Sequence, residues 1–267
     1  MTELREPSVR ELFDLTGRIA LFTGASGHLG WAMARALTEA GCQVIVASRS
    51  RKTALKTARA LAQKRVGKPL WVTIDHMSET SIKRGFQRAV KLAGHIDILI
   101  CNGHEVLAAD WRNVTGAQFT RQLANATGYF LLARLLRDQA VERKAPASII
   151  MLGSMYGQVA SYPDVYEGIG PANPAAYQTL KAGVIQLTRH LAAAWAKDQV
   201  RVNCLSPGPF PSAGAAAALV DRLRTKSPMN RIGQPHELKG AIVFLASDAS
   251  SYVTGHNLVV DGGWTAW

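Results

Sequence analysis

The fold is decided by residues 18–30, "RIALFTGASGHLG", in which a short apolar run meets a turn with glycines at 24, 27 and 30. After the turn, Met33, Ala36, Leu37 and Ala40 follow the i, i+3, i+4, i+7 spacing of a helix face. A strand, a glycine turn and a helix in this order place free N–H groups and a positive helix dipole at the turn. The stretch therefore predicts a cradle for phosphate groups.

Short apolar runs like the first recur along the chain and alternate with segments of helical periodicity. Strands that are apolar on both faces and alternate with helices form parallel sheets that are covered on both sides. The sequence therefore predicts an α/β fold of the Rossmann type, a doubly wound, seven-stranded parallel sheet in three αβα layers. The expected strands are residues 18–22, 43–47, 70–74, 96–100, 148–152, 201–206 and 257–260. One expected helix begins near residue 28, and the others cover 50–66, 79–93, 115–139, 175–197 and 235–246.

The composition is globular, with 267 residues of which 48% are hydrophobic and 19% charged, and the length suits one large domain as well as two small ones. No linker, repeat or low-complexity segment marks a boundary, so we expect one domain over 1–267 with an N-terminal extension at 1–16. The net charge of +12 has two interpretations, a basic surface that maintains solubility or attraction to an anionic cofactor, substrate or partner. Nucleic acid is not expected, because the basic residues do not interleave with aromatic ones.

The cysteines and the N-terminus point to one cellular setting. Cys42, Cys101 and Cys204 lie far apart beside apolar runs, which predicts buried, reduced thiols. The seven histidines form no pair at metal-ligand spacing, so no metal is expected. The N-terminus carries both charge signs, unlike a secretory signal, and no apolar run reaches the roughly 18 to 20 residues of a membrane helix. We therefore expect a soluble, cytoplasmic protein without membrane contact.

Four polar residues suggest chemistry. "AAYQTLKAG" places Tyr177 and Lys181 four positions apart, on one helix face. A free tyrosine has a pKa of about 10, and a nearby ammonium that stabilises the phenolate would lower this pKa into the range of a general acid/base. Ser154 follows the strand at 148–152, and Asn125 lies in the preceding long helix. Ligands of open α/β sheets bind outside the carboxyl ends of the strands, where "CNGH" (101–104) and "SPGPFPS" (206–212) are also expected.

The motifs follow one order along the chain: a glycine turn, Asn, Ser, Tyr-x-x-x-Lys, Pro-Gly and a terminal Val-Asp-Gly-Gly. In this order, and over nearly its whole length, the chain resembles the short single-domain branch of the short-chain dehydrogenase/reductase family. The resemblance implies hydride transfer between the nicotinamide C4 and a carbonyl or alcohol carbon. It implies that Tyr177 donates and accepts the proton, that Ser154 orients the reacting oxygen, and that Lys181 binds the nicotinamide ribose and lowers the pKa of Tyr177. Asn125 would hold the water of a proton relay, and the protein would form a homo-oligomer, a dimer or a tetramer.

Three features depart from the family pattern. The turn reads T-G-x-x-G-x-x-G, closer to the family's longer branch, with His28 where the short branch has glycine. The usual Asn-Asn-Ala-Gly is "CNGH", in which Asn102 is retained but Cys101 and His104 are substituted. Ser154 and Tyr177 lie 177 − 154 = 23 positions apart, more than is common in the branch.

The second expected strand ends in "VASRS", which bears on the choice of cofactor. An acidic residue there would bind the adenosine ribose and repel a 2′-phosphate, but this chain has Ser48 followed by Arg49, which favours NADP(H) over NAD(H). Alternatively, Arg49 only covers the adenine. Asp75 and His76 match the family's adenine-flanking positions. The residues expected at the cofactor are Gly24, Ser26, Gly27, His28, Leu29, Gly30, Ser48, Arg49, Arg51, Asp75, His76, Asn102, Gly103, Tyr177, Lys181, Pro207, Gly208, Phe210 and Ser212.

The extra residues before the expected catalytic helix fall at 158–174. We expect this insertion to cap the substrate pocket, with Tyr156, Tyr166 and Glu167 offering polar groups to a polyhydroxylated substrate. The alternative is a surface loop that packs on itself or on a neighbouring subunit. Residues 207–230 are expected to form a mobile substrate loop with a short helix. The insertion and "PGPFPS" resemble gluconate 5-dehydrogenases and other sugar, sugar-acid or polyol dehydrogenases.

Two other functions stay open at this point. A 3-oxoacyl-[acyl-carrier-protein] reductase would explain the basic charge, since its carrier protein is acidic, but the tyrosine-rich insertion does not suggest an acyl channel. A regulator that binds NADPH without turnover would explain the altered motifs, although Asn125, Ser154, Tyr177 and Lys181 are all present. The apolar tail "GGWTAW" is expected either against another subunit or over the chain's own cofactor cleft.

Overall fold

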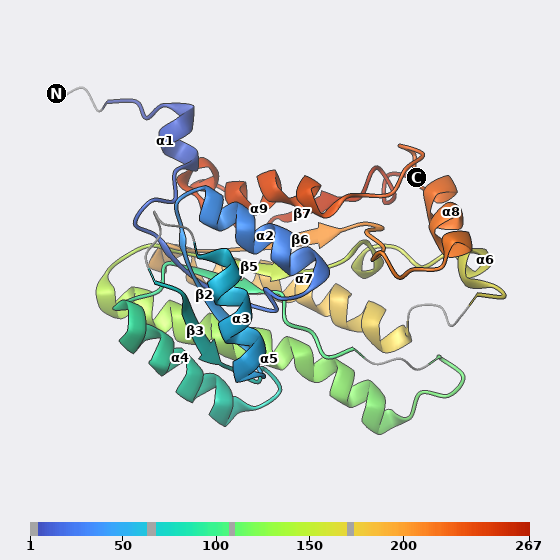
Figure 1. Cartoon of the computed structure of the whole chain (residues 1–267), viewed down its shortest axis with the longest axis horizontal. Coiled ribbons are helices and arrows are strands. Elements are labelled where there is room, and N and C mark those ends of the chain that lie inside the picture. Colours follow the sequence, from blue (N-terminus) through green and yellow to red (C-terminus); the bar gives the residue numbers. More distant parts are fainter. Residues whose placement is uncertain (1–4, 63–67, 107–109, 170–173) are drawn as a thin grey trace.

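Seven parallel strands form the central sheet, in the order β3-β2-β1-β4-β5-β6-β7 (Figure 1). The computed structural model describes residues 5–62, 68–106, 110–169 and 174–267. All seven strands arise where the sequence predicts them, and the predicted Rossmann-type sheet is confirmed. Their bounds are β1 Ile19–Thr23, β2 Gln43–Ser48, β3 Leu70–Thr73, β4 Ile98–Cys101, β5 Ala147–Leu152, β6 Val200–Pro207 and β7 Asn257–Val260.

The burial of the strands explains their continuous apolar runs. Every residue of the central strands β1, β4 and β5 is buried, because helices cover both faces of a parallel sheet. The edge strands β3 and β7 are only partly buried. The middle of the sheet is therefore the rigid frame from which the loops at its carboxyl edge project.

Two helical layers enclose the sheet (Figure 1). The helices α2 (His28–Glu39), α3 (Arg51–Leu61) and α9 (Lys239–Ala246) pack with one set of strand side chains around Phe22 and Leu37. On the other face, α4 (Glu79–Ala93), α5 (Gly116–Arg143) and α7 (Ala175–Trp195) pack with the alternate strand side chains around Leu21 and Tyr129. The predicted three-layer αβα arrangement is thus confirmed.

Helix ends differ more from expectation than strands do. Helix α3 ends at Leu61, and residues 63–67 of the segment expected to be helical lie outside the described residues. Helix α5 continues to Arg143, four residues beyond its expected end, and stops where Lys144 takes a left-handed conformation with φ of 53°. The segment expected at 235–246 divides into a 3-10 turn, Pro235–Leu238, and α9.

Three short helices lie outside these layers. In the N-terminal extension, of which residues 1–4 are outside the described part, α1 (Val9–Phe13) precedes Leu15, a buried core residue. The insertion contains α6 (Pro163–Tyr166), and the 207–230 segment contains α8 (Ala217–Lys226). No helix within the described ranges is both long and apolar enough to cross a bilayer.

The strand order reverses between β1 and β4, which creates the crevice where open α/β sheets bind ligands. The glycine turn leaves β1 at Thr23, and Asn102 leaves β4 directly after Cys101. Thr23 and Cys101 are paired in register, so the two loops emerge side by side. The topology therefore brings two of the predicted motifs to one point.

Candidate active site

The glycine turn is held in shape by the residues that follow β4. Asn102 donates from Nδ2 to the Gly24 carbonyl over 2.9 Å, and the Thr23 hydroxyl accepts from the backbone N–H groups of Asn102 and Gly103, each over 3.0 Å. Gly24 has a φ of +74°, and a Cβ on it would lie 2.9 Å from the Gly103 backbone. A Cβ on Gly30 would lie 2.1 Å from the Gly24 carbonyl oxygen. Both positions therefore require glycine.

The turn opens into a cavity of about 290 Å³ at the crevice. This cavity collects many of the residues expected at the cofactor from four separate loops, and the Ser48–Arg49 pair lies at the end where β2 terminates. It is lined by Thr23, Gly24, Ser26, Gly27, Ala47, Ser48, Arg49, Ile74, His76, Asn102, Gly103 and His104.

The N-terminus of α2 fits a pyrophosphate. Helices α3, α4 and α5 are capped by the side chains of Ser50, Ser78 and Thr115, whereas the N-cap of α2 is Gly27, which offers no side chain. The first N–H groups of α2 thus remain available to an anion, and the helix dipole favours its charge. His28 is the first residue of α2 and is exposed. The cradle that a Cβ would fill and the uncapped helix together fit a dinucleotide.

Ser154, Tyr177 and Lys181 meet next to this cavity, beyond the carboxyl end of β5. A hydrogen bond joins Ser154 to the Tyr177 phenol. The Lys181 ammonium is buried one turn further along α7, donates to the Leu152 carbonyl over 2.7 Å and lies 5.6 Å from the centre of the Tyr177 ring. The structure thus brings together three of the four residues that the sequence singled out.

The pKa of Tyr177 departs from the expectation that Lys181 lowers it. Burial raises this pKa, and the hydrogen bond from Ser154 only partly opposes the effect. The ammonium points at the Leu152 carbonyl, and its own burial lowers the pKa of Lys181 to about 8. In this arrangement burial favours the neutral phenol, and Ser154 is the group that favours its ionised form.

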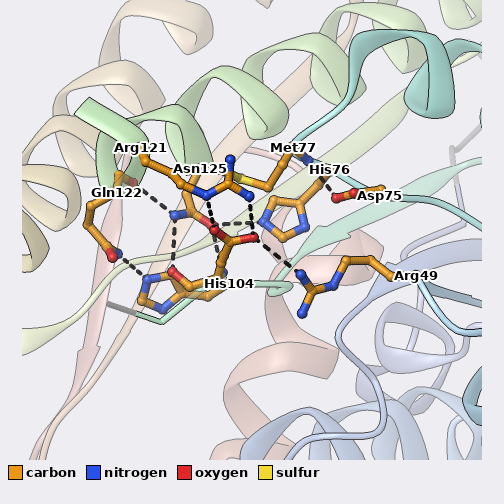
Figure 2. Close-up of polar contacts among 9 residues, drawn as sticks. Arg49, Asp75, His76, Met77, His104, Arg121, Gln122 and Asn125 are labelled. Carbon is orange, nitrogen blue, oxygen red and sulfur yellow. Dashed lines mark hydrogen bonds and ion pairs between the residues drawn. The ribbon is translucent and has the colours of Figure 1, made fainter. Parts of the chain in front are cut away.

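Asn125 has no hydrogen-bonding position left for a relay water on its side chain. Its Oδ1 accepts from the Glu105 N–H and contacts His76 Nε2, each over 2.8 Å (Figure 2). Its Nδ2 donates to the Gln122 carbonyl over 2.8 Å and to the Glu105 carbonyl over 3.3 Å. These four contacts use the full capacity of a primary amide. Asn125 thus fixes the backbone that follows β4.

His104 fills the place where the family pattern has a small residue. Its ring centre lies 5.4 Å from that of Tyr177, and its Nε2 is hydrogen-bonded to Gln122. Burial, with the positive charge of Lys181, lowers the pKa of His104 to about 3. A neutral imidazole therefore separates the Tyr177 ring from the dinucleotide cavity.

The structure adds an ionic cluster that the sequence analysis did not single out (Figure 2). Glu105 accepts from Arg121 Nε over 2.5 Å and from Arg121 Nη2 over 3.0 Å, and it accepts from Arg49 Nη1 over 3.2 Å. One signal was available in the sequence: Arg121, Gln122 and Asn125 are polar residues that recur on one side of the first turns of α5.

Several expected cofactor residues do not line the cavity. Arg51 turns away and stacks over the Trp71 ring, 5.5 Å from its centre. Asp75 accepts from the Met77 N–H over 3.0 Å, and Leu29 is partly buried against the core. Pro207 ends β6 beside Val260 and Gly208 follows it against Asp261, while Phe210 faces a separate hollow. Ser212 is exposed in the following loop, where it accepts a hydrogen bond from the Ala215 N–H.

Residues 170–173 of the insertion lie outside the described part of the chain. The rest of the insertion packs onto the side of Tyr177 away from the dinucleotide cavity. Tyr156 and Tyr166 share a 2.7 Å hydroxyl–hydroxyl hydrogen bond. Arg222 of α8 donates to the Glu167 carbonyl over 2.6 Å and to the Asp164 carbonyl over 3.0 Å. These elements form one apolar cluster with the C-terminal tail. The cluster contains Met155, Tyr156, Val165, Leu223 and Trp264, with Tyr162, Tyr166 and Tyr177 at its border.

The tail is therefore covered by its own chain at Trp264, which is 1% exposed and packs edge-on to Tyr156 and Tyr162. A second hollow, of about 570 Å³, lies between the insertion and residues 110–112. The side chains of Asp110, Arg112, Asp164, Tyr166 and Glu167 line it beside the apolar Trp111 and Pro163, and we call it the polar hollow. Two of the three expected substrate residues thus reach this hollow, while the third, Tyr156, is held behind Tyr166.

Known proteins share both the sequence and the fold. A family model described as Enoyl-(Acyl carrier protein) reductase matches residues 24–265. Cis-4-hydroxycyclohexanecarboxylate dehydrogenase of Sinomonas cyclohexanicum is 33% identical over 262 residues, which cover 93% of this chain and 97% of the relative. A short-chain type dehydrogenase/reductase from Mycobacterium marinum has a TM-score of 0.87 and 34% identity, covering 98% of this chain and 100% of that one.

A gluconate 5-dehydrogenase from Burkholderia cenocepacia, solved with NADP and tartrate, has a TM-score of 0.86 and 29% identity, covering 97% of this chain and 100% of that one. These similarities extend over nearly the whole chain. The chain is an oxidoreductase of alcohols and carbonyls that uses a nicotinamide cofactor and acts on small molecules. It belongs to the short-chain dehydrogenase/reductase family.

Proposed function

We propose that the protein is an NADP(H)-dependent dehydrogenase of a sugar, sugar acid or polyol, in which Tyr177 is the general acid/base. The observation that carries this proposal is the cluster of Ser154, Tyr177 and Lys181 between the dinucleotide cavity and the polar hollow under the insertion. The nicotinamide supplies the hydride chemistry when it is bound. Tyr177 gives its proton to the carbonyl oxygen in reduction and takes it back in oxidation, with Ser154 orienting that oxygen.

Two observations support the choice of substrate. Arg112 and the hydroxyl and carboxylate groups of the hollow suit a small polar molecule with several hydroxyls. The relatives include enzymes named for a hydroxycyclohexanecarboxylate and for gluconate, both hydroxy acids. The 3-oxoacyl-[acyl-carrier-protein] reductase remains the second candidate because the matching family model is named for a reductase of another carrier-bound substrate, an enoyl group. An acetoacetyl thioester tests the 3-oxoacyl activity directly.

The proposed roles predict a specific loss in Tyr177→Phe. The variant should lose about 10²- to 10⁴-fold in kcat, the usual contribution of a positioned acid/base, and should bind NADPH as tightly as the wild type. The measurement is NADP(H)-coupled turnover over sugar acids, polyols, keto sugars and an acetoacetyl thioester, with NADPH affinity followed by fluorescence. Turnover that survives this substitution would exclude Tyr177 as the proton donor.

The NADP(H) preference rests on Arg49, which lines the cavity where β2 ends without a carboxylate on that strand. We expect Arg49→Gln to lower kcat/KM for NADPH about tenfold and to leave the value for NADH unchanged, since only the 2′-phosphate loses a partner. Arg51→Gln is the matched control, because Arg51 stacks on Trp71 outside the cavity. A wild type that prefers NADH would contradict the proposal.

A further inference from the structure

Glu105 brings a negative charge to the end of the cavity where a 2′-phosphate would be recognised. It follows His104, which lines the cavity, and its carboxylate bonds to Arg49, which also lines it (Figure 2). The Glu105 side chain is only 22% exposed. Neither its sequence position nor the family resemblance gave this residue a role.

The position of the carboxylate is fixed from two sides. The Glu105 backbone is tied to the buried Asn125 amide by two hydrogen bonds, of 2.8 and 3.3 Å. Its carboxylate is held by two bonds from Arg121, of 2.5 and 3.0 Å, the bidentate geometry that guanidinium groups favour. Glu105 is therefore a stationary charge at this end of the cavity.

Arg49 is the loosely bound member of the cluster. Its contact with Glu105 is a single hydrogen bond of 3.2 Å, and its side chain is 58% exposed. Arg49 can thus leave Glu105 for another anion, whereas Glu105 keeps its bonds to Arg121 and cannot follow. A phosphate that binds Arg49 must share the guanidinium with the Glu105 carboxylate. It must also lie near that carboxylate, which carries a charge of the same sign.

We propose that Glu105 sets the cofactor selectivity of this site by competing with the 2′-phosphate of NADP(H) for the Arg49 guanidinium. The inference rests on the proposed role of Arg49 in binding that phosphate. Glu105 lowers the affinity for NADP(H) but not the affinity for NAD(H), which has no 2′-phosphate. The preference for NADP(H) is therefore smaller than Arg49 alone would produce. Arg121 acts in the opposite sense, because it holds and neutralises the competing carboxylate.

The test uses 2′,5′-ADP and 5′-AMP, which differ by the 2′-phosphate alone, in calorimetric titrations of the full chain. Glu105→Gln keeps the shape and the contact to Arg121 but removes the charge. It should tighten 2′,5′-ADP binding about three- to fivefold, the scale of an exposed ion pair, and leave 5′-AMP unchanged. The gain should shrink between low and high salt, because mobile ions screen the repulsion.

Asp198→Asn is the matched control. Asp198 is 24% exposed, is paired with Arg137 over 2.7 Å and precedes β6, at the edge of the sheet opposite the cavity. Asp198→Asn changes the net charge by the same amount as Glu105→Gln and should alter the affinity for neither 2′,5′-ADP nor 5′-AMP. Unchanged 5′-AMP binding in Glu105→Gln shows that the cavity is intact in that variant.

The outcomes separate this inference from the proposed cofactor preference. If Arg49→Gln weakens 2′,5′-ADP while Glu105→Gln leaves it unchanged or weakens it, Arg49 reads the phosphate but Glu105 does not compete, and the inference is wrong. If Arg49→Gln has no effect on 2′,5′-ADP, the proposed basis of NADP(H) preference fails and the competition fails with it. Tighter binding in Glu105→Gln, with Asp198→Asn unchanged, supports the competition.

Discussion

His104 connects the stability of the fold to the site through its protonation. Its ring lies against Tyr177, and burial lowers its pKa to about 3, whereas an unfolded histidine has a pKa of about 6.5. Between these two values the unfolded chain binds a proton that the folded chain does not. The free energy of unfolding therefore falls as the pH falls from about 6.5 towards 3, by up to about 2 kcal/mol at pH 5 relative to pH 8.

We expect His104→Gln to remove this part of the pH dependence, because glutamine does not titrate. Urea unfolding at pH 5 and pH 8 gives the two free energies for the wild type and for the variant. His190→Gln, on an exposed position of α7, is the control for replacing a histidine elsewhere. An equal loss of stability at pH 5 in wild type and His104→Gln would show that His104 titrates normally.

Single residues were predictable where sequence spacing alone fixes their neighbours. Tyr177 and Lys181 are four apart on one helix, so their proximity follows from helix geometry. The orientations of Arg49 and Arg51 were not predictable, because one meets Glu105 from another loop and the other meets Trp71 on the next strand. The sequence pattern identifies such charged residues, but packing between distant segments decides where each one points.

The strand–turn–helix element at β1 and α2 depends on close contact between backbones. Gly30→Ala would place a Cβ 2.1 Å from the Gly24 carbonyl oxygen and 2.8 Å from Asn102 Nδ2, so the turn must open. We expect a loss of about 1 to 3 kcal/mol in the free energy of unfolding, the cost of overpacking, and weaker NADPH binding. Calorimetry and a fluorescence titration measure the two effects.

Gly183→Ala provides the matched comparison for that prediction. Gly183 lies on α7, and a Cβ there would meet nothing within 4 Å. Alanine is a better helix former than glycine by about 1 kcal/mol at an exposed position, so this variant should gain stability. Similar losses in the two variants would show that the Gly30 contact is not what makes the turn sensitive.

Two cations of α8 hold the insertion: Arg222 donates to carbonyls of Asp164 and Glu167, and Lys226 pairs with the Asp164 carboxylate. Arg222→Gln should loosen the wall of the polar hollow and raise KM for the alcohol or carbonyl substrate about tenfold, about 1.4 kcal/mol of binding. NADPH affinity should not change, because the dinucleotide cavity has other walls. Steady-state kinetics measure KM, and Arg189→Gln is the control because Arg189 lies exposed on α7. An equal rise of KM in both variants would contradict the prediction.

Elements were predictable to different degrees for physical reasons. The central strands were located to within two residues at either end, because burial on both faces leaves continuous apolar runs. The end of α5 was missed, because Lys144 carries no glycine-like signal for its left-handed conformation. The packing of the insertion against α8 and Trp264 was also missed, because it joins segments far apart in the sequence.

At the scale of the whole molecule, three thiols report on whether the chain opens as one unit. Cys42 lies in the core on one side of the sheet, and Cys101 and Cys204 lie in the core on the other side. All three are buried and unpaired, as the sequence predicts. Burial raises the pKa of each thiol, that of Cys204 to about 11, so none is a reactive thiolate in the native state.

A single cooperative domain over 1–267 predicts that an aromatic disulfide reagent modifies all three thiols at one rate, that of opening of the shared sheet. Peptide mapping of partly labelled protein gives the rate for each cysteine. NADPH at about a hundred times its Kd should slow all three about a hundredfold, because it binds the folded chain alone. Faster labelling of Cys204 than of Cys42 would mean that the half of the sheet bearing β6 opens separately, and the chain would then contain two units of folding.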